Sequence, residues 1–123
     1  MMSLEKLNYW ADSYIKFQEK QEVPPSSSEK WWPVWKFYDL NDDNPEICWQ
    51  VILLIISKTT DENVLGILGA GPLEDLIHSH GPAFVDRIED EAKNNERFKS
   101  VLGNVWESST EQVWGRIQKI LAA

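Results

Sequence analysis

Signals that begin helices recur along this chain, and each precedes a segment in which apolar residues repeat every three or four positions. No segment shows the sustained alternation of apolar and polar residues that a half-buried strand requires. We therefore predict an all-α protein. The predicted helices span residues 4–21, 29–40, 45–58, 60–68, 72–80, 82–93, 96–106 and 109–121.

Four positions carry the signals for helix starts. Ser26, Thr59 and Ser108 each stand three residues before a glutamate, which is the spacing of a capping box. Asn44 precedes a proline and then an acid, an order typical of a capped first turn. This cap and a length of about 13 residues favour a central buried helix over a strand for the apolar run at 51–56.

Glycine followed by proline predicts two helix boundaries. The segment Gly69-Ala70-Gly71 is expected to end one helix, and Pro72 to begin the next. Gly81 and Pro82 repeat the arrangement, so we expect a positive φ angle at Gly81.

The length of 123 residues fits a single domain. We divide it into an N-terminal helix at 1–21, a linker rich in proline and serine at 22–28, and a stack of helices at 29–121. Because the turns between the later helices are short, neighbouring helices must be antiparallel. The expected architecture is a stack of helical hairpins that resembles HEAT repeats, an α-solenoid fragment.

Twenty acidic residues against twelve basic ones give a net charge of −8, the wrong sign for holding a phosphate backbone, so nucleic acid is excluded as a partner. The longest apolar run has six residues, far below the roughly 20 that cross a bilayer, so no membrane partner is expected. The N-terminal segment lacks the features of a secretory signal. A cytoplasmic location is the expectation.

Residues 69–76, GAGPLEDL, together with His80 and Gly81, resemble the signature of an uncharacterised family of small bacterial all-helical proteins, a domain of unknown function. The segment at 42–49, DDNPEICW, and the pair Arg97-Phe98 stand in the matching order, so the resemblance covers residues 39–121. It implies an all-helical fold and a bacterial origin, and it implies no activity.

Glu74, Asp75, His78 and His80 are the only candidates for a metal or hydrolytic centre. On a helix, Glu74 and Asp75 lie four and three residues from His78, the spacing of a carboxylate-histidine half-site. No further histidine supplies a second half, and the lone Cys48 lies in an apolar run where a buried structural thiol is expected. We favour placement of the acids and histidines at opposite ends of one helix by its macrodipole, and predict no catalytic residue, metal ligand or cofactor.

Seven tryptophans are many for this length. Trp35 and Trp49 are expected in the core. Trp31 and Trp35 share a helix face and Trp32 points about 100° away, so not all three can enter one core. Trp32 is either covered by the N-terminal helix or exposed as an anchor for a binding partner.

The negative charge is regional: residues 39–91 hold twelve acids and two bases, a net of −10, while the rest of the chain has a net of +2. If successive turns of a hairpin stack line one edge, the acids there form an edge that attracts a basic partner. The alternative is that these acids only satisfy helix dipoles and keep the protein soluble. The candidate partner-binding residues are Asp42, Asp43, Glu46, Asp61, Glu62, Glu74, Asp75 and Trp32.

The functional hypothesis is a non-enzymatic interaction protein whose acidic edge binds a basic protein. Immunity proteins that neutralise nuclease toxins have this size and charge, because blocking a phosphate-binding cleft requires carboxylates in place of phosphates. Two alternatives stay open. One is a helical metal-binding protein or hydrolase centred on Glu74, Asp75, His78 and His80, and the other is a structural subunit that forms a homodimer through a tryptophan face.

Overall fold

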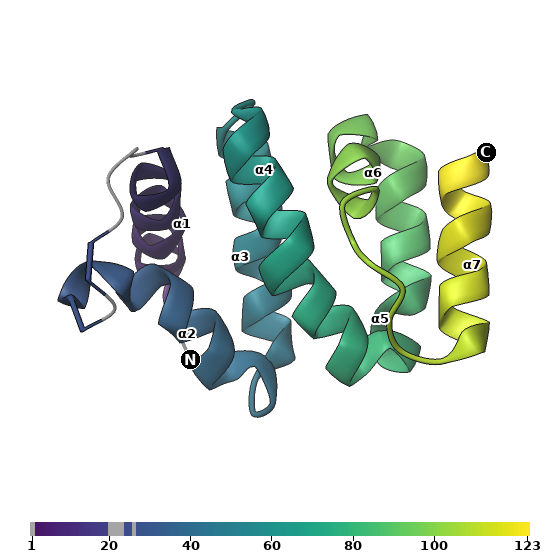
Figure 1. Ribbon diagram of the computed structural model, residues 1–123, viewed down its shortest axis with the longest axis horizontal. Coiled ribbons are helices and arrows are strands. Elements are labelled where there is room, and N and C mark those ends of the chain that lie inside the picture. The colour runs from purple at the N-terminus through teal and green to yellow at the C-terminus, as the bar shows by residue number, and fades with distance from the viewer. Residues whose placement is uncertain (1, 20–23, 26) are drawn as a thin grey trace. The chain divides into compact units, whose positions relative to one another are not determined.

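The structure is a computed structural model that describes residues 2–19, 24–25 and 27–123 (Figure 1). Every regular element in these ranges is helical and none is a strand, so the predicted all-α class is confirmed. The chain forms two compact units, one up to Leu65 and one from Gly66 onward.

The first unit is built on three helices and one short 3₁₀ turn. Helix α1 packs against α2 and α3, and α2 packs against α3. The prediction of a helix at 4–21 is met over 4–19, and the two positions after that lie outside the described residues. The elements are α1 (Leu4–Glu19), η1 (Glu29–Trp31), α2 (Trp32–Asn41) and α3 (Pro45–Lys58).

Aromatic side chains join α1 to α2 in the core of the first unit. The ring of Phe37 lies 4.6 Å from that of Trp10 and meets the ring of Tyr14 edge to face at 5.5 Å. The indole N–H of Trp10 donates a 2.8 Å hydrogen bond to the carbonyl of Pro33. Because Trp10 is fully buried, this bond satisfies a donor that would otherwise be costly to bury.

The apolar run at 51–56 forms the middle of α3, as predicted for a central helix. Ile52 and Ile55 are fully buried, and Trp49 is 6% exposed, which confirms its predicted place in the core. Asn44 precedes the helix and Pro45 is its first residue, although the Asn44 side chain makes no capping hydrogen bond.

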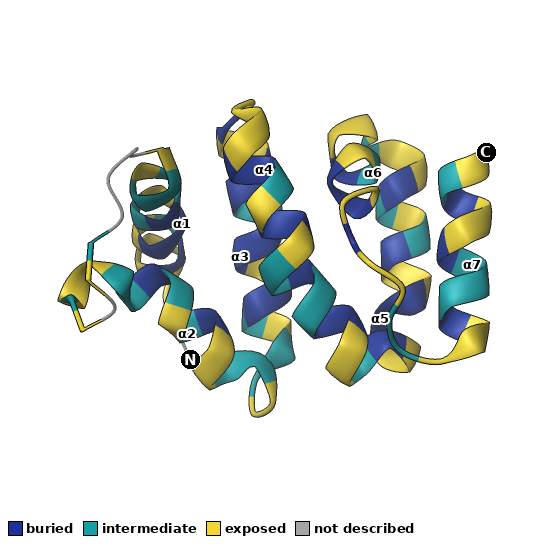
Figure 2. Ribbon diagram, viewed as in Figure 1, coloured by how far each residue is buried: buried dark blue, intermediate teal, exposed yellow. Residues whose placement is uncertain are grey.

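The second unit is arranged around the long helix α5, which packs against α6 and α7. Buried residues lie along one side of α7, namely Val113, Ile117 and Ile120 (Figure 2). The boundary between the two units falls within α4. The elements are α4 (Glu62–Leu68), η2 (Gly69–Leu73), α5 (Glu74–Asn94), α6 (Glu96–Leu102) and α7 (Glu111–Ala122).

The predicted helix end before Gly69 is confirmed, since α4 ends at Leu68, but Pro72 does not begin the next helix, because it lies inside the turn η2 and α5 starts at Glu74. Residues 69–73 form a π-helical turn, and the backbone N–H of Glu74 bonds to the carbonyls of Gly69 and Gly71. The chain thus runs from α4 into α5 without a free helix end. Glycine is required at 69 for packing, because a Cβ there would contact the carbonyl oxygen of Val101 and lie 2.9 Å from the Cβ of Asn104.

The predicted break between helices near Gly81 is present, because α5 consists of two helical segments that meet at a kink at His80 (φ −135°, ψ 19°), but the positive φ angle expected at Gly81 is wrong. No glycine in the described ranges has a positive φ angle. A Cβ at Gly81 would contact Ser109 and lie 3.1 Å from Cγ1 of Val113. Gly81 therefore allows close approach of the segment before α7, a tertiary requirement that is invisible in local sequence.

Two predicted caps are replaced by residues nearer the helix. Asp61 caps α4, because its Oδ1 accepts hydrogen bonds from the N–H groups of Asn63 (2.9 Å) and Val64 (3.1 Å), while Thr59 Oγ1 accepts one from Asp61 N–H. Thr110, not Ser108, caps α7. Both caps lie two residues later than the capping boxes indicated, so the side chain next to the first turn makes the bond.

The other helix boundaries differ less from the predicted ones. Ser26 lies outside the described residues, as does part of the predicted linker, and Ser28 caps the turn η1. Asn95 caps α6 by accepting a hydrogen bond from Phe98 N–H at 3.1 Å. Helix α6 ends at Leu102 rather than at Trp106. Among the helices that the structure describes, none is long and apolar enough to cross a membrane.

Candidate functional site

Helix α2 presents aromatic and acidic side chains on the side opposite its core contacts. Only Pro33 and Phe37 of this helix are buried. Spacings of three, four and seven residues place its outward residues on one face. Trp35 is 41% exposed and Tyr38 is 62% exposed. We call the α2 face the residues Trp35, Tyr38, Asp39 and Asp42, all of them exposed.

The exposure of Trp35 corrects the prediction that it lies in the core. Phe37 fills the space beside Trp10 and Tyr14, and it stands two residues from Trp35, or about 200° around the helix. Phe37 and Trp35 therefore cannot both face α1. The sequence contained a signal that was missed, because Asp39 and Asp42 share the side of Trp35 and mark that side as polar.

Three predicted site residues gather where α2 passes into α3. Asp42, Asp43 and Glu46 are exposed, and we call them the acidic turn. Asp42 is the C-cap of α2, and the last turn of that helix holds no basic residue. A helix macrodipole favours cations at this end, so Asp42 adds negative potential where the helix already supplies some.

Asp61 and Glu62 do not join the acidic turn. They follow α3, whose 14 residues correspond to a length of about 21 Å, and the two turns lie at opposite ends of this helix (Figure 1). Successive turns of antiparallel helices alternate between two ends, so the acids cannot all share one edge. Asp61 is also engaged as the cap of α4.

The other two predicted acids belong to the second unit. Glu74 Oε1 accepts a 2.7 Å hydrogen bond from the backbone N–H of Trp106. Burial raises the pKa of Asp75, the adjacent charge of Glu74 raises it further, and His78 acts in the opposite direction. Both acids lie in the first turn of α5, as expected, although the π-helical turn η2 runs directly into that turn.

The four residues of the predicted alternative centre have separate contacts. Nδ1 of His78 lies 3.2 Å from Oγ of Ser108, and the ring of His80 lies 6.5 Å from that of Phe84. Within residues 2–19, 24–25 and 27–123, no group of three or more histidine, cysteine, aspartate or glutamate side chains is placed to hold a metal ion.

Trp32 is neither fully covered by the N-terminal helix nor fully exposed, the two arrangements that the sequence allowed. It is half-buried, its ring stacks on that of Tyr9 from α1 at 5.7 Å, and the ammonium group of Lys36 lies 6.0 Å from its centre. The N-terminal helix therefore covers Trp32 in part. Tyr9 itself is 66% exposed and continues this aromatic surface outward.

Cys48 has the structural role expected of it. The thiol is buried, and Sγ lies 3.8 Å from the carbonyl of Phe37, to which it donates a weak hydrogen bond. Burial raises the pKa of Cys48 to about 11, which keeps the thiol protonated at neutral pH.

These observations define an all-α protein of short helices that carries an exposed aromatic and acidic face. The chain belongs to the Family of unknown function (DUF6869), which it matches over residues 18–123, a range that includes the α2 face and the acidic turn. The expected membership of a family of unknown function is thus confirmed. No curated protein and no solved structure matches the chain.

Proposed function

We propose that this protein is a non-catalytic binding module that holds a basic segment of another protein on the α2 face and the acidic turn. The observation that carries this proposal is the exposure of Trp35 and Tyr38 on the same side of one helix as Asp39 and Asp42.

The chemistry of this face suits lysine and arginine side chains. Carboxylates such as Asp39 and Asp42 bind guanidinium and ammonium groups by charge-assisted hydrogen bonds. The faces of indole and phenol rings attract the same cations, and tryptophan and tyrosine are enriched among residues that dominate binding energy. Trp35 and Tyr38 can therefore pack on the side chains whose charges the aspartates neutralise.

The position of Asp42 supports a role in binding over a purely local one. An acid at the C-terminal end of a helix lowers helix stability, because it meets the negative end of the macrodipole. The alternative explanation, that acids in the turns stabilise helix dipoles, therefore does not apply to Asp42 at the C-terminal end of α2. A basic partner would remove this repulsion on binding.

For the partner we propose a basic protein of the nuclease type, which makes the chain an immunity protein. A carboxylate-bearing surface can occupy a cleft built for phosphates. The HEAT-like stacking of hairpins and the bacterial origin implied by residues 69–81 form part of this same proposal. A second copy of the chain is a poorer partner for this face, because two faces that each carry Asp39 and Asp42 repel one another.

The experiment begins with the immobilised protein and a lysate of the native host, from which salt-released proteins are identified. Association of the purified partner is then measured with the parent chain and with the triple variant Asp39→Asn, Asp42→Asn, Asp43→Asn. We expect association to slow by about tenfold at low salt and to lose much of its salt dependence.

A matched control removes the same charge elsewhere, with Glu62→Gln, Asp90→Asn and Glu107→Gln, all at exposed positions. This control should bind at close to the parental rate. Equal slowing in both variants would show that net charge alone attracts the partner, and recovery of an acidic partner would reject the proposal.

A further inference from the structure

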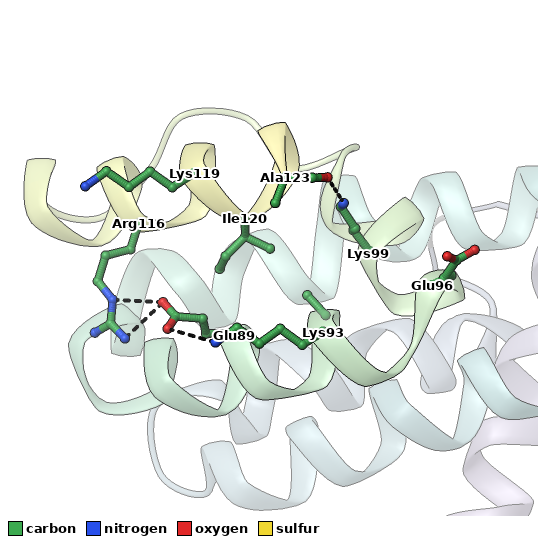
Figure 3. Close-up of a pocket in the computed structure, with 9 residues that line it drawn as sticks. Glu89, Lys93, Glu96, Lys99, Arg116, Lys119, Ile120 and Ala123 are labelled. Atoms are coloured by element: carbon green, nitrogen blue, oxygen red, sulfur yellow. Dashed lines mark hydrogen bonds and ion pairs between the residues drawn. The ribbon is translucent and has the colours of Figure 1, made fainter.

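The second unit contains a groove of about 480 Å³ (Figure 3). It lies between α5, α6 and α7, and its volume is within the range of sites that bind small molecules. The residues that line it are Glu89, Ala92, Lys93, Glu96, Lys99, Arg116, Lys119, Ile120 and Ala123.

The charge of this groove is opposite to that of the unit around it. Residues 66–123 contain nine acids and six bases. Four of the six bases line the groove, but only two of the nine acids do. In an acidic protein, this gathering of cations on one concave surface creates a local site of positive potential.

Arg116 forms a fixed wall of the groove. Its guanidinium group lies 2.7 Å from Asp86 Oδ1 and 3.1 Å from Glu89 Oε2. Glu89 is also 3.9 Å from the ammonium group of Lys93, so the charge of Glu89 is shared between two bases. The other acid, Glu96, points away from these groups (Figure 3).

The lysines keep donors for a ligand. The side chain of Lys119 makes no hydrogen bond or ion pair with any residue in the described part of the chain. Lys99 donates one bond of 2.6 Å to the oxygen of Ala123, which leaves two of its three ammonium hydrogens. The side chain of Lys93 is 67% exposed, so its ammonium group is accessible despite the long contact with Glu89.

Apolar surface lies beside these cations. The exposed edges of Ala92 (4% exposed) and Ile120 (9% exposed) line the groove next to the methylene stems of the lysines. A ligand for this groove therefore needs an anionic group for the lysines and an apolar part for the contact with Ala92 and Ile120.

Helix macrodipoles explain part of the arrangement, since Lys93, Lys99 and Lys119 each lie in the last turn of their helices. A dipole acts on each lysine separately. It does not require that three helix ends meet around one groove, or that Lys119 has no acidic partner.

We propose that this groove binds a small organic anion, a carboxylate or phosphate attached to a short apolar chain. The anion contacts Lys93, Lys99 and Lys119, and the apolar chain lies over Ala92 and Ile120. This site differs in unit and in charge from the α2 face, so it does not depend on the proposed function.

The test uses octanoate as the probe, with octanol as the neutral analogue and inorganic phosphate as the anion without an apolar chain. Calorimetry measures affinity, and amide signals of the ¹⁵N-labelled protein locate the site. Octanoate should bind saturably and shift signals of residues 89–99 and 116–123. Octanol and inorganic phosphate should each bind at least about tenfold more weakly, equal to about 1.4 kcal/mol.

The informative variant is Lys93→Gln with Lys119→Gln, and the matched control is Lys16→Gln with Lys30→Gln; all four lysines are exposed. Octanoate binding should weaken by about tenfold in the first variant and stay unchanged in the control, with equal circular dichroism in both. Equal affinity in both variants, absence of saturable octanoate binding, or equal binding of octanol would each overturn the proposal.

A further arm separates a free anion from a lipid headgroup. Sedimentation with vesicles of phosphatidylcholine, with and without phosphatidylglycerol, should leave the protein in the supernatant. Binding to the anionic vesicles in the absence of octanoate binding would reject a soluble organic anion as the ligand.

Discussion

The carboxylate of Glu74 accepts a 2.7 Å hydrogen bond from the backbone N–H of Trp106, a residue 32 positions further along the chain. This bond fastens the connection between α6 and α7 to the start of α5. It gives Glu74 a structural role at a place where the sequence alone suggested either a metal ligand or an edge for docking. Trp106 remains 77% exposed, so the bond holds its backbone while the indole ring faces outward.

Replacement of Glu74 tests this role. Glu74→Ala removes the acceptor, and because water can reach the exposed Trp106 amide, we expect a loss of about 1 kcal/mol in unfolding free energy. Hydrogen exchange of the Trp106 amide, followed by NMR, should accelerate. Glu74→Gln keeps an acceptor oxygen and should lose less. If Glu74→Ala leaves the exchange of this amide unchanged, the hydrogen bond does not hold the connection.

Gly81 is predicted to be sensitive to any side chain. A Cβ there would contact Ser109 and lie 3.1 Å from Cγ1 of Val113, so Gly81→Val must displace the segment before α7. Overpacking of this kind costs about 1–3 kcal/mol, measured by denaturant unfolding. The φ angle at Gly81 is not positive, so the expected loss comes from crowding and not from backbone strain.

Gly115 supplies the matched control, because it also lies within a helix but a Cβ there would have no neighbour within 4 Å. Gly115→Ala should raise the free energy of unfolding by about 0.5–1 kcal/mol through helix propensity. Destabilisation by both substitutions would indicate that glycine is needed in these helices for another reason.

Sequence reasoning predicted the helical class because the period of apolar residues depends on local chain geometry. The run at 51–56 illustrates this, since Asn44 and Pro45 favoured a helix where composition alone allowed a strand. It failed where tertiary contacts decide. Gly69 and Gly81 are glycines because backbone or side chains of distant residues lie against them, and no pattern near them in the sequence distinguishes this from a helix end.

The candidate site was predicted in part for a similar reason. The sequence correctly indicated that Asp42 and Asp43 lie exposed at a turn, because two consecutive acids just before a helix start are rarely buried. The grouping of these acids with Asp61 and Glu62 was wrong, because the turns before and after α3 lie at opposite ends of that helix, which the sequence pattern does not show. The exposure of Trp35 could not be predicted without knowing that Phe37, and not Trp35, fills the space beside Trp10.

Cys48 should react slowly with iodoacetamide at pH 8 in the native protein. Burial of the thiol blocks access and raises the pKa of Cys48 to about 11, so little thiolate is present. In urea the same cysteine should react at the rate of an ordinary free thiol, which mass spectrometry can follow. Native labelling as fast as labelling in urea would mean that the thiol lies open to solvent.

Ionisation of Asp75 is expected to lower the stability of the fold. Burial disfavours the carboxylate and the charge of Glu74 adds to the effect, so the pKa of Asp75 is higher in the folded protein than its ordinary value of 3.8, despite the opposing influence of His78. The folded state then holds this proton more tightly than the unfolded chain does. The stability that results is fully present below pH 3.8 and is lost as the pH rises through the folded pKa.

At pH 7 the ionised Asp75 therefore destabilises the fold, and Asp75→Asn, which keeps the shape without the charge, should raise the melting temperature. The advantage of the variant over the parent should shrink as the pH falls toward 3.8. Asp90→Asn, at an exposed position in the same helix, controls for the change in net charge. A melting temperature that falls at pH 7 in Asp75→Asn alone would show that the charge of Asp75 stabilises the fold and that its partners outweigh the cost of burial.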